Sequence, residues 1–196
     1  NSRRTFVHSA ALLERHLVDH GGATFLEGLH RHGLRIEMGF IDERHPQRSS
    51  NYFRSWQERF GTDDRDEAAR RCREATHQFD ECWWKDEGGG HFTLMTRVRV
   101  PAFHDGHLLF PRIALDPPSL QNGHRRYPRG DGVEFSRDEV DLLLHAFLDT
   151  REGVSWNAGD LLLVDNLRYG HSREAFEGPR SLAVAMAGSV SVGRMR

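Results

Sequence analysis

The sequence predicts a fold of mainly β-strands with flanking helices, arranged as a single domain. Apolar and polar residues alternate over 34–40 and 92–100, as they do in strands with one buried face. An unbroken apolar run at 161–164 lies between Gly-Asp and Asp-Asn pairs, which is typical of a strand covered on both faces. Two or three helices are expected to cover the strands, and 196 residues suffice for one hydrophobic core.

The composition excludes two classes of partner. Lys and Arg number 27 against 29 Asp and Glu, so no strong field favours nucleic acid or an anionic membrane surface. No apolar run approaches the length of a membrane span. The two cysteines, Cys72 and Cys82, lack the spacing of a metal site and fit a reduced protein. We therefore expect a cytoplasmic protein that binds neither nucleic acid nor membrane.

The first third of the chain carries the signals of two helices and a strand. Ser9 is a suitable N-cap for a helix over 9–20, which would carry Leu12, Leu13 and Leu17 on one side. The segment Thr24-Phe25-Leu26-Glu27 has the form of a capping box, so a second helix should begin there and end at Gly33. The strand at 34–40 follows, and the polar stretch 42–54 reads as a loop.

The middle of the chain alternates helix and strand signals. Ser55 to Glu58 form another capping box, Gly61 ends that turn, and Asp63 or Asp64 begins a helix with a small apolar side. Two strands, at 79–84 and 92–100, are separated by a turn at 86–90.

A histidine-rich hairpin and a long helix come next. Asp105-Gly106 predicts a tight turn between two strands, and the flanking His104 and His107 would suit either that hairpin or a zinc site. Residues 116–133 form a long loop rich in Pro and Gly. Ser136 then caps an amphipathic helix, and the residues expected to face inward are Val140, Leu143, Leu144, Phe147 and Leu148.

The C-terminal stretch places an arginine among apolar residues. If residues after Gly178-Pro179 form a strand, Arg180 shares one face with Leu182, Val184 and Met186. A guanidinium in an interior cannot lose its charge and needs an anionic partner. His171 lies nine residues earlier, just after the predicted strand at 161–164, where a short turn could bring it to the mouth of the same interior.

Two segments resemble a known family. GDLLLVDNLRYGHSREAFEGPRSLAVAMAG, ending at Gly188, is similar to the C-terminal signature of the taurine dioxygenase-like iron(II)/2-oxoglutarate oxygenases. SWQERFGTDDRDEAARRC, beginning at Ser55, is similar to an upstream stretch of the same family. The resemblance implies a double-stranded β-helix, or jelly roll, which also meets the description of a strand-rich domain with covering helices.

The resemblance also implies a site and a reaction. His171 would be a metal ligand for Fe(II), and Arg180 would bind the distal carboxylate of the cosubstrate 2-oxoglutarate, so that both are catalytic residues. The implied reaction consumes O2, decarboxylates 2-oxoglutarate to succinate and oxidises a C–H bond of a small molecule, with relatives often acting on free or carrier-bound amino acids. The loop at 42–54 would be either a lid over the substrate or an ordinary loop, and Arg97 or Arg99 would face either substrate or solvent.

One feature of the family pattern is missing. The other two ligands of the 2-His-1-carboxylate triad come from a His-x-Asp or His-x-Glu pair upstream, and no such pair occurs in these residues. We therefore expect the chain to lack an N-terminal part that carries the pair, and these 196 residues alone to bind iron weakly or not at all. The alternative is a metal-free jelly roll that binds a small anion or a partner subunit.

Overall fold

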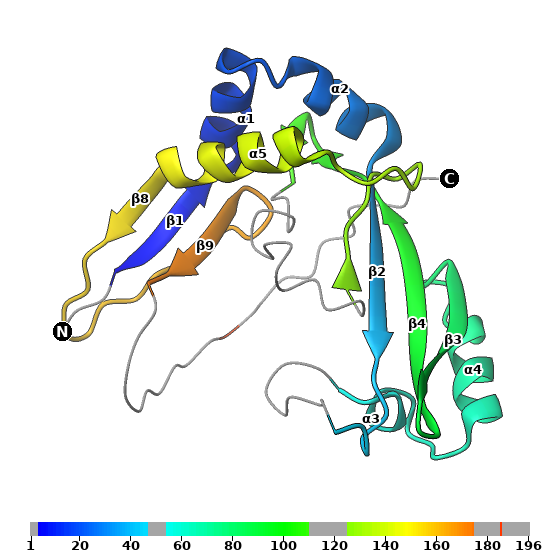
Figure 1. The fold of residues 1–196 in the computed structure, drawn as a ribbon. Coiled ribbons are helices and arrows are strands. Elements are labelled where there is room, and N and C mark those ends of the chain that lie inside the picture. Colours follow the sequence, from blue (N-terminus) through cyan, green and yellow to red (C-terminus); the bar gives the residue numbers. More distant parts are fainter. Residues whose placement is uncertain (1–3, 47–53, 110–124, 175–184, 186–196) are drawn as a thin grey trace. The chain divides into compact units, whose positions relative to one another are not determined.

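The computed structural model describes residues 4–46, 54–109, 125–174 and 185, and the chain packs as two compact units. The first unit holds the described residues of 1–33, 101–115 and 135–194, and the second holds those of 34–100 and 116–134. Figure 1 shows the strands and helices of each unit. None of the helices in the described ranges is long and apolar enough to cross a membrane.

The first unit is built on a three-stranded antiparallel sheet in the order β8-β1-β9. Its strands are β1 (Thr5–Ser9), β8 (Arg151–Val154) and β9 (Tyr169–Arg173). Its helices are α1 (Ala10–Asp19), α2 (Ala23–His32) and α5 (Arg137–Asp149), and a hairpin joins β5 (Phe103–His104) to β6 (His107–Leu108). The fully buried leucines Leu13, Leu17, Leu29 and Leu143 lie on the inner sides of the helices.

The second unit is a four-stranded antiparallel sheet in the order β3-β4-β2-β7, packed on two helices (Figure 1). Its strands are β2 (Leu34–Phe40), β3 (Glu81–Gly88), β4 (His91–Val100) and β7 (Arg125–Arg126). Its helices are α3 (Trp56–Phe60) and α4 (Arg65–Glu74). One face of the sheet supplies the core, which contains Phe40, Trp56, Phe60, Ala68, Cys72 and Leu94.

Most local signals correspond to observed elements. Both Ser55 and Ser136 accept a hydrogen bond from the backbone N–H three residues on, and the glutamate there bonds back, so both capping boxes are confirmed. Asp64 caps α4, and Gly61 ends α3 in the left-handed conformation. The Asp105-Gly106 turn is confirmed, with both residues at positive φ.

Three local predictions are wrong. Thr24 does not cap α2, which begins at Ala23 after an N-cap at Gly22 that makes no side-chain bond. On α5 the buried side chains are Leu143, Ala146 and Phe147, whereas Leu144 and Leu148 are exposed. Leu12 of α1 is likewise exposed, while Leu13 and Leu17 are buried.

The predicted strand at 161–164 is not observed. These residues have no regular structure, and the side chains of Leu161 and Leu163 are 92% and 93% exposed. An extended apolar segment becomes a strand only when another strand supplies hydrogen-bond partners, and no described strand pairs with this one. The β-rich fold with flanking helices is confirmed. The described residues form no closed barrel, so the jelly roll and the single domain stay predictions.

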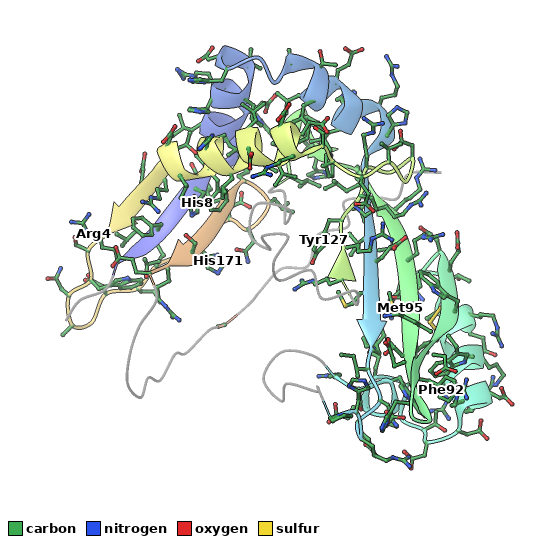
Figure 2. All side chains as sticks on the ribbon, viewed as in Figure 1. Arg4, His8, Phe92, Met95, Tyr127 and His171 are labelled. Atoms are coloured by element: carbon green, nitrogen blue, oxygen red, sulfur yellow. A yellow bond between two sulfur atoms is a disulfide. The ribbon has the colours of Figure 1, made fainter. Side chains whose placement is uncertain are left out.

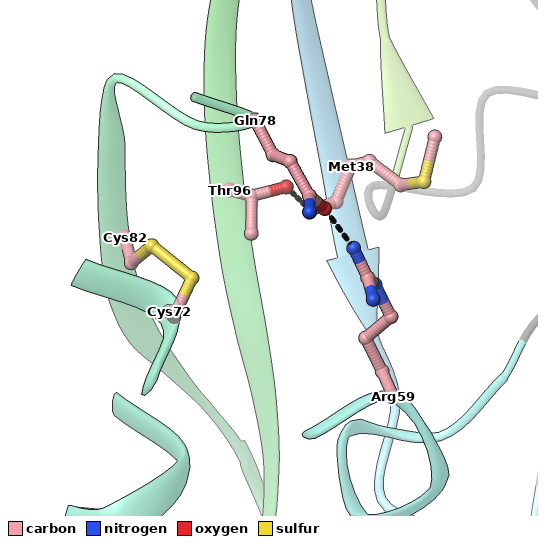
Figure 3. Close-up of a disulfide and its surroundings, with 6 residues drawn as sticks. All are labelled: Met38, Arg59, Cys72, Gln78, Cys82 and Thr96. Atoms are coloured by element: carbon pink, nitrogen blue, oxygen red, sulfur yellow. Dashed lines mark hydrogen bonds between the residues drawn. A yellow bond between two sulfur atoms is a disulfide. The ribbon is translucent and has the colours of Figure 1, made fainter. Parts of the chain in front are cut away.

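The prediction that the two cysteines are reduced is wrong. Cys72 of α4 and Cys82 of β3 form a disulfide, with their Cα atoms 6.4 Å apart (Figure 3). The helix packs its small apolar side on the sheet, and this brings Cys72 next to β3. Thr96 of β4, drawn beside the disulfide, donates from its hydroxyl to the carbonyl of Met38 on β2 at 3.0 Å. The spacing of the cysteines therefore gives no argument for a reducing compartment.

Candidate active site

His171 lies on the outer face of the three-stranded sheet, within β9 (Figure 2). The sequence places His171 after a strand and a short turn; the turn is observed at 165–168, whereas the strand before it is not, and His171 itself lies within β9, which starts at Tyr169. Successive residues of a strand alternate between its faces, so the buried Gly170 and partly buried Ser172 face inward and His171 faces outward. The imidazole of His171 is exposed and accessible to a ligand.

The strand register defines the surroundings of His171. Val7 of β1 is directly opposite His171 on one side and directly opposite Glu152 of β8 on the other, so all three share the outer face. Two strand spacings, roughly 10 Å, therefore separate the backbones of His171 and Glu152. Metal ligands lie about 2 Å from the ion, so this pair does not by itself form a metal centre. No group of three His, Cys, Asp or Glu in the described residues is arranged to hold a metal.

A buried histidine fixes β9 from the inner face. His8 of β1 is fully buried, and its Nε2 lies 2.7 Å from the hydroxyl oxygen of Ser172. Its ring stacks on Phe147 of α5 with 3.7 Å between the ring centroids. These contacts join β1, β9 and α5, and they determine that Ser172 points inward while its neighbour His171 points outward. Strand β1 is not predicted from the sequence, and His8 is therefore not identified as a buried residue. The signal that could have predicted it is that Phe6 and His8 are two residues apart, the spacing of residues on one face of a strand.

The environment of His8 favours the neutral imidazole. Burial lowers the pKa of His8 below its ordinary value of 6.5, because the charged form loses its hydration. The positive charges of Arg151 and His171 lower this pKa further, and a hydrogen bond with the backbone of Phe147 opposes them. A neutral ring can both stack on Phe147 and exchange a hydrogen bond with Ser172.

The turn that precedes β9 is built by Asp165. Its carboxylate accepts a hydrogen bond from the N–H of Leu167 at 3.0 Å, and its carbonyl accepts from the N–H of Tyr169 at 2.9 Å. Asp165 therefore has a structural role in this turn. The start of β9, and with it the position of His171, follows from this turn.

A hollow of about 250 Å³ lies between this turn and the β5–β6 hairpin. The residues that line it are His104, Asp105, His107, Leu109, Asp165, Leu167 and Arg168. His104 and His107 face each other across the hairpin, but the described residues do not complete a zinc set around them. Five of its seven lining residues are polar, and on one side the hollow is bounded by the turn that leads into β9.

Two further site predictions concern other parts of the chain. Arg180 lies outside the described residues, as do residues 47–53 of the predicted loop. Arg97 of β4 makes ion pairs with Glu37 at 2.9 Å and Glu81 at 2.7 Å, so it belongs to a charge network across the sheet.

Two known proteins are similar to this chain. The chain is 28% identical over 147 residues to the dapdiamide synthesis protein DdaC of Enterobacter agglomerans. The matched region covers 67% of this chain and 44% of that protein. It is 25% identical over 169 residues to a clavaminate synthase-like protein of Arabidopsis thaliana, which covers 83% of this chain and 49% of that protein. No family model matches the chain. The chain thus spans less than half the length of these distant relatives, one named for a biosynthetic role and one for its likeness to a synthase.

Proposed function

We propose that the protein is an iron(II)- and 2-oxoglutarate-dependent oxygenase that oxidises a small molecule in a biosynthetic pathway, with free or carrier-bound amino acids as the substrate class. The observation that carries the proposal is the C-terminal motif in which His171 and Arg180 occur in the order and spacing of that family. The likeness to a dapdiamide synthesis protein and to a clavaminate synthase-like protein supports it.

In this proposal the described residues would supply one metal ligand, His171. His171 offers an exposed imidazole on strand β9, and a neutral imidazole is a suitable ligand for first-row metals. The described residues do not add two further ligands within reach of it, so they do not fit iron by themselves. The proposal therefore requires a histidine and a carboxylate from elsewhere in the protein. O2 would be the oxidant, and iron bound together with 2-oxoglutarate, which supplies two electrons, would activate it.

The contribution of this chain is then one of position and binding. The His8–Ser172 contact and the Asp165 turn hold β9, and His171 extends from its outer face. Arg180 would pair with the distal carboxylate of 2-oxoglutarate through two parallel N–H···O bonds, which the planar guanidinium is shaped to make. Loss of that arginine would leave a desolvated carboxylate without its partner.

The test is 2-oxoglutarate turnover by the protein expressed from its complete reading frame. Succinate formation should require Fe(II), O2 and Arg180, and Arg180→Ala should raise the 2-oxoglutarate concentration for half-maximal rate by at least about 100-fold, as expected for a lost charge-assisted pair. Arg137→Ala is the control, because Arg137 is 93% exposed on α5. Equal 2-oxoglutarate dependence in Arg180→Ala and wild type would remove Arg180 from the site.

A second candidate is a non-catalytic module that binds a small anion through Arg180, or pairs with another subunit, without iron. It is favoured by one observation, that no group of three His, Cys, Asp or Glu side chains among the described residues, His171 included, is arranged to hold a metal. The residues encoded before Asn1 discriminate the two. A His-x-Asp or His-x-Glu pair there supports the oxygenase, and its absence supports the binding module.

A further inference from the structure

Two cross-strand residue pairs on one face of the four-stranded sheet, each called a rung, carry different charges. Strands β2 and β4 pair so that Glu37 is directly opposite Arg97, and Arg35 is directly opposite Arg99. Residues opposite each other in an antiparallel pair share a face, so all four side chains extend from the same side. The first rung joins opposite charges, with Arg97 Nε 2.9 Å from Glu37 Oε1. The second rung joins two cations.

The two cations of the second rung are held close together at the backbone. The N–H of Arg35 donates to the carbonyl of Pro128, on the side away from β4, at 2.9 Å. Arg35 and Arg99 therefore form a non-hydrogen-bonded pair, the kind in which opposite Cα atoms are only about 4.5 Å apart. Like charges directly opposite each other destabilise a sheet, and both residues are partly buried, where water screens charge less.

Three carboxylates in this unit accept hydrogen bonds from groups other than the guanidinium groups of Arg35 and Arg99. Glu37 is buried and accepts from Arg97 and Arg126, at 2.9 Å and 3.4 Å. The carboxylate of Asp80 accepts a hydrogen bond from the backbone N–H of Arg99 at 2.6 Å. This bond does not involve the guanidinium of Arg99. Asp131 accepts hydrogen bonds from two nitrogens of Arg129.

The Nε donors of the pair, on Arg35 and Arg99, are buried and have no hydrogen-bond partner among the described residues. The guanidinium of Arg35 is oriented by one bond, from Nη2 to the carbonyl of Gly130 at 3.3 Å. A Cβ on Gly132 would lie 2.7 Å from Nη1 of Arg35, so the glycine at that position leaves the space that the guanidinium occupies.

We propose that the Arg35–Arg99 rung of the second unit is a binding site for a small oxyanion, a carboxylate or a phosphate. An anion here offsets the repulsion of the two guanidinium groups and accepts from their buried donors, and arginine matches the planar oxygen geometry of either group. The site is independent of the proposed oxygenase function, because it requires neither iron nor His171 nor Arg180.

The experiment is calorimetric titration of the full chain with inorganic phosphate and with malonate, at constant ionic strength. Wild type should bind one anion per chain, and the anion that saturates identifies the source as phosphate or carboxylate. Arg35→Gln and Arg99→Gln should each weaken binding at least about 10-fold, and the double variant should abolish it, since each removes one charged donor group. Arg137→Gln, with a 93% exposed side chain, should leave binding unchanged.

A stability measurement separates a binding site from a structural contact. In anion-free buffer Arg99→Gln should unfold at the same or higher urea concentration than wild type, because it removes a like-charge repulsion. If Arg99 instead stabilised the fold directly, without an anion, Arg99→Gln would lower the urea concentration at the unfolding midpoint. Absence of saturable binding of both anions to wild type, or unchanged binding by the double variant, would overturn the proposal.

Discussion

Breaking the Cys72–Cys82 disulfide should destabilise the protein by a calculable amount. The bond closes a loop of 10 residues between α4 and β3. In the chain-entropy treatment, a cross-link over about 10 residues restricts the unfolded chain enough to contribute about 2.7 kcal/mol to the unfolding free energy. Cys72 is fully buried, and as a thiol it can remain in the core as a small apolar group. Reduction should therefore cost close to the entropic value.

The assay is urea unfolding followed by tryptophan fluorescence, with and without a phosphine reductant. The unfolding free energy should fall by about 2–3 kcal/mol on reduction. The double variant Cys72→Ala/Cys82→Ala is the control, because the reductant should not change its unfolding curve. A change below about 0.5 kcal/mol on reduction, or two free thiols in the untreated protein by alkylation and mass spectrometry, would refute the reasoning.

Three other perturbations have defined outcomes. Because burial lowers the pKa of His8, the unfolded chain binds more protons than the folded one below about pH 6.5. The unfolding free energy should then fall as pH drops from 6.5, by at most about 1.4 kcal/mol per unit, and His8→Gln should remove this slope in urea titrations at several pH values. Gly132→Ala, at φ +90° and against Arg35, should cost about 1–3 kcal/mol in the same assay, and no loss would contradict the observed turn. Leu163→Asp should change stability by less than about 0.5 kcal/mol, whereas Leu94→Ala in the core should cost about 2–5 kcal/mol. A large loss of unfolding free energy for Leu163→Asp would show that residues 161–164 are buried.

The elements that were predicted well are those whose signals are local. The capping boxes at Ser55 and Ser136 satisfy helix N–H groups within four residues, so the start of each of these two helices could be predicted from the neighbouring sequence. The turn at Asp105-Gly106 likewise depends on two residues that tolerate positive φ.

The features that were missed depend on partners distant in the sequence. The apolar run at 161–164 has the composition of a strand but no described pairing partner. His8 is read correctly only when β9 and α5 are placed beside it, more than 130 residues later in the chain. The charge pattern at Arg35 and Arg99 is invisible until the register of β2 and β4 is known. At the candidate site, the sequence motif indicated His171 as a candidate ligand. Strand β9, which carries His171, was not predicted and is seen only in the structure.

The most direct test of the central claim is an iron count on the protein expressed from its complete reading frame. Anaerobic equilibrium dialysis against Fe(II) should give one iron per chain for wild type and for His145→Ala, an exposed histidine on α5 used as control. His171→Ala should remain folded, because its side chain is exposed on the outer face of β9, and should bind no iron. If His171→Ala retains one iron per chain with unchanged affinity, His171 is not a metal ligand and the oxygenase assignment of this site is wrong.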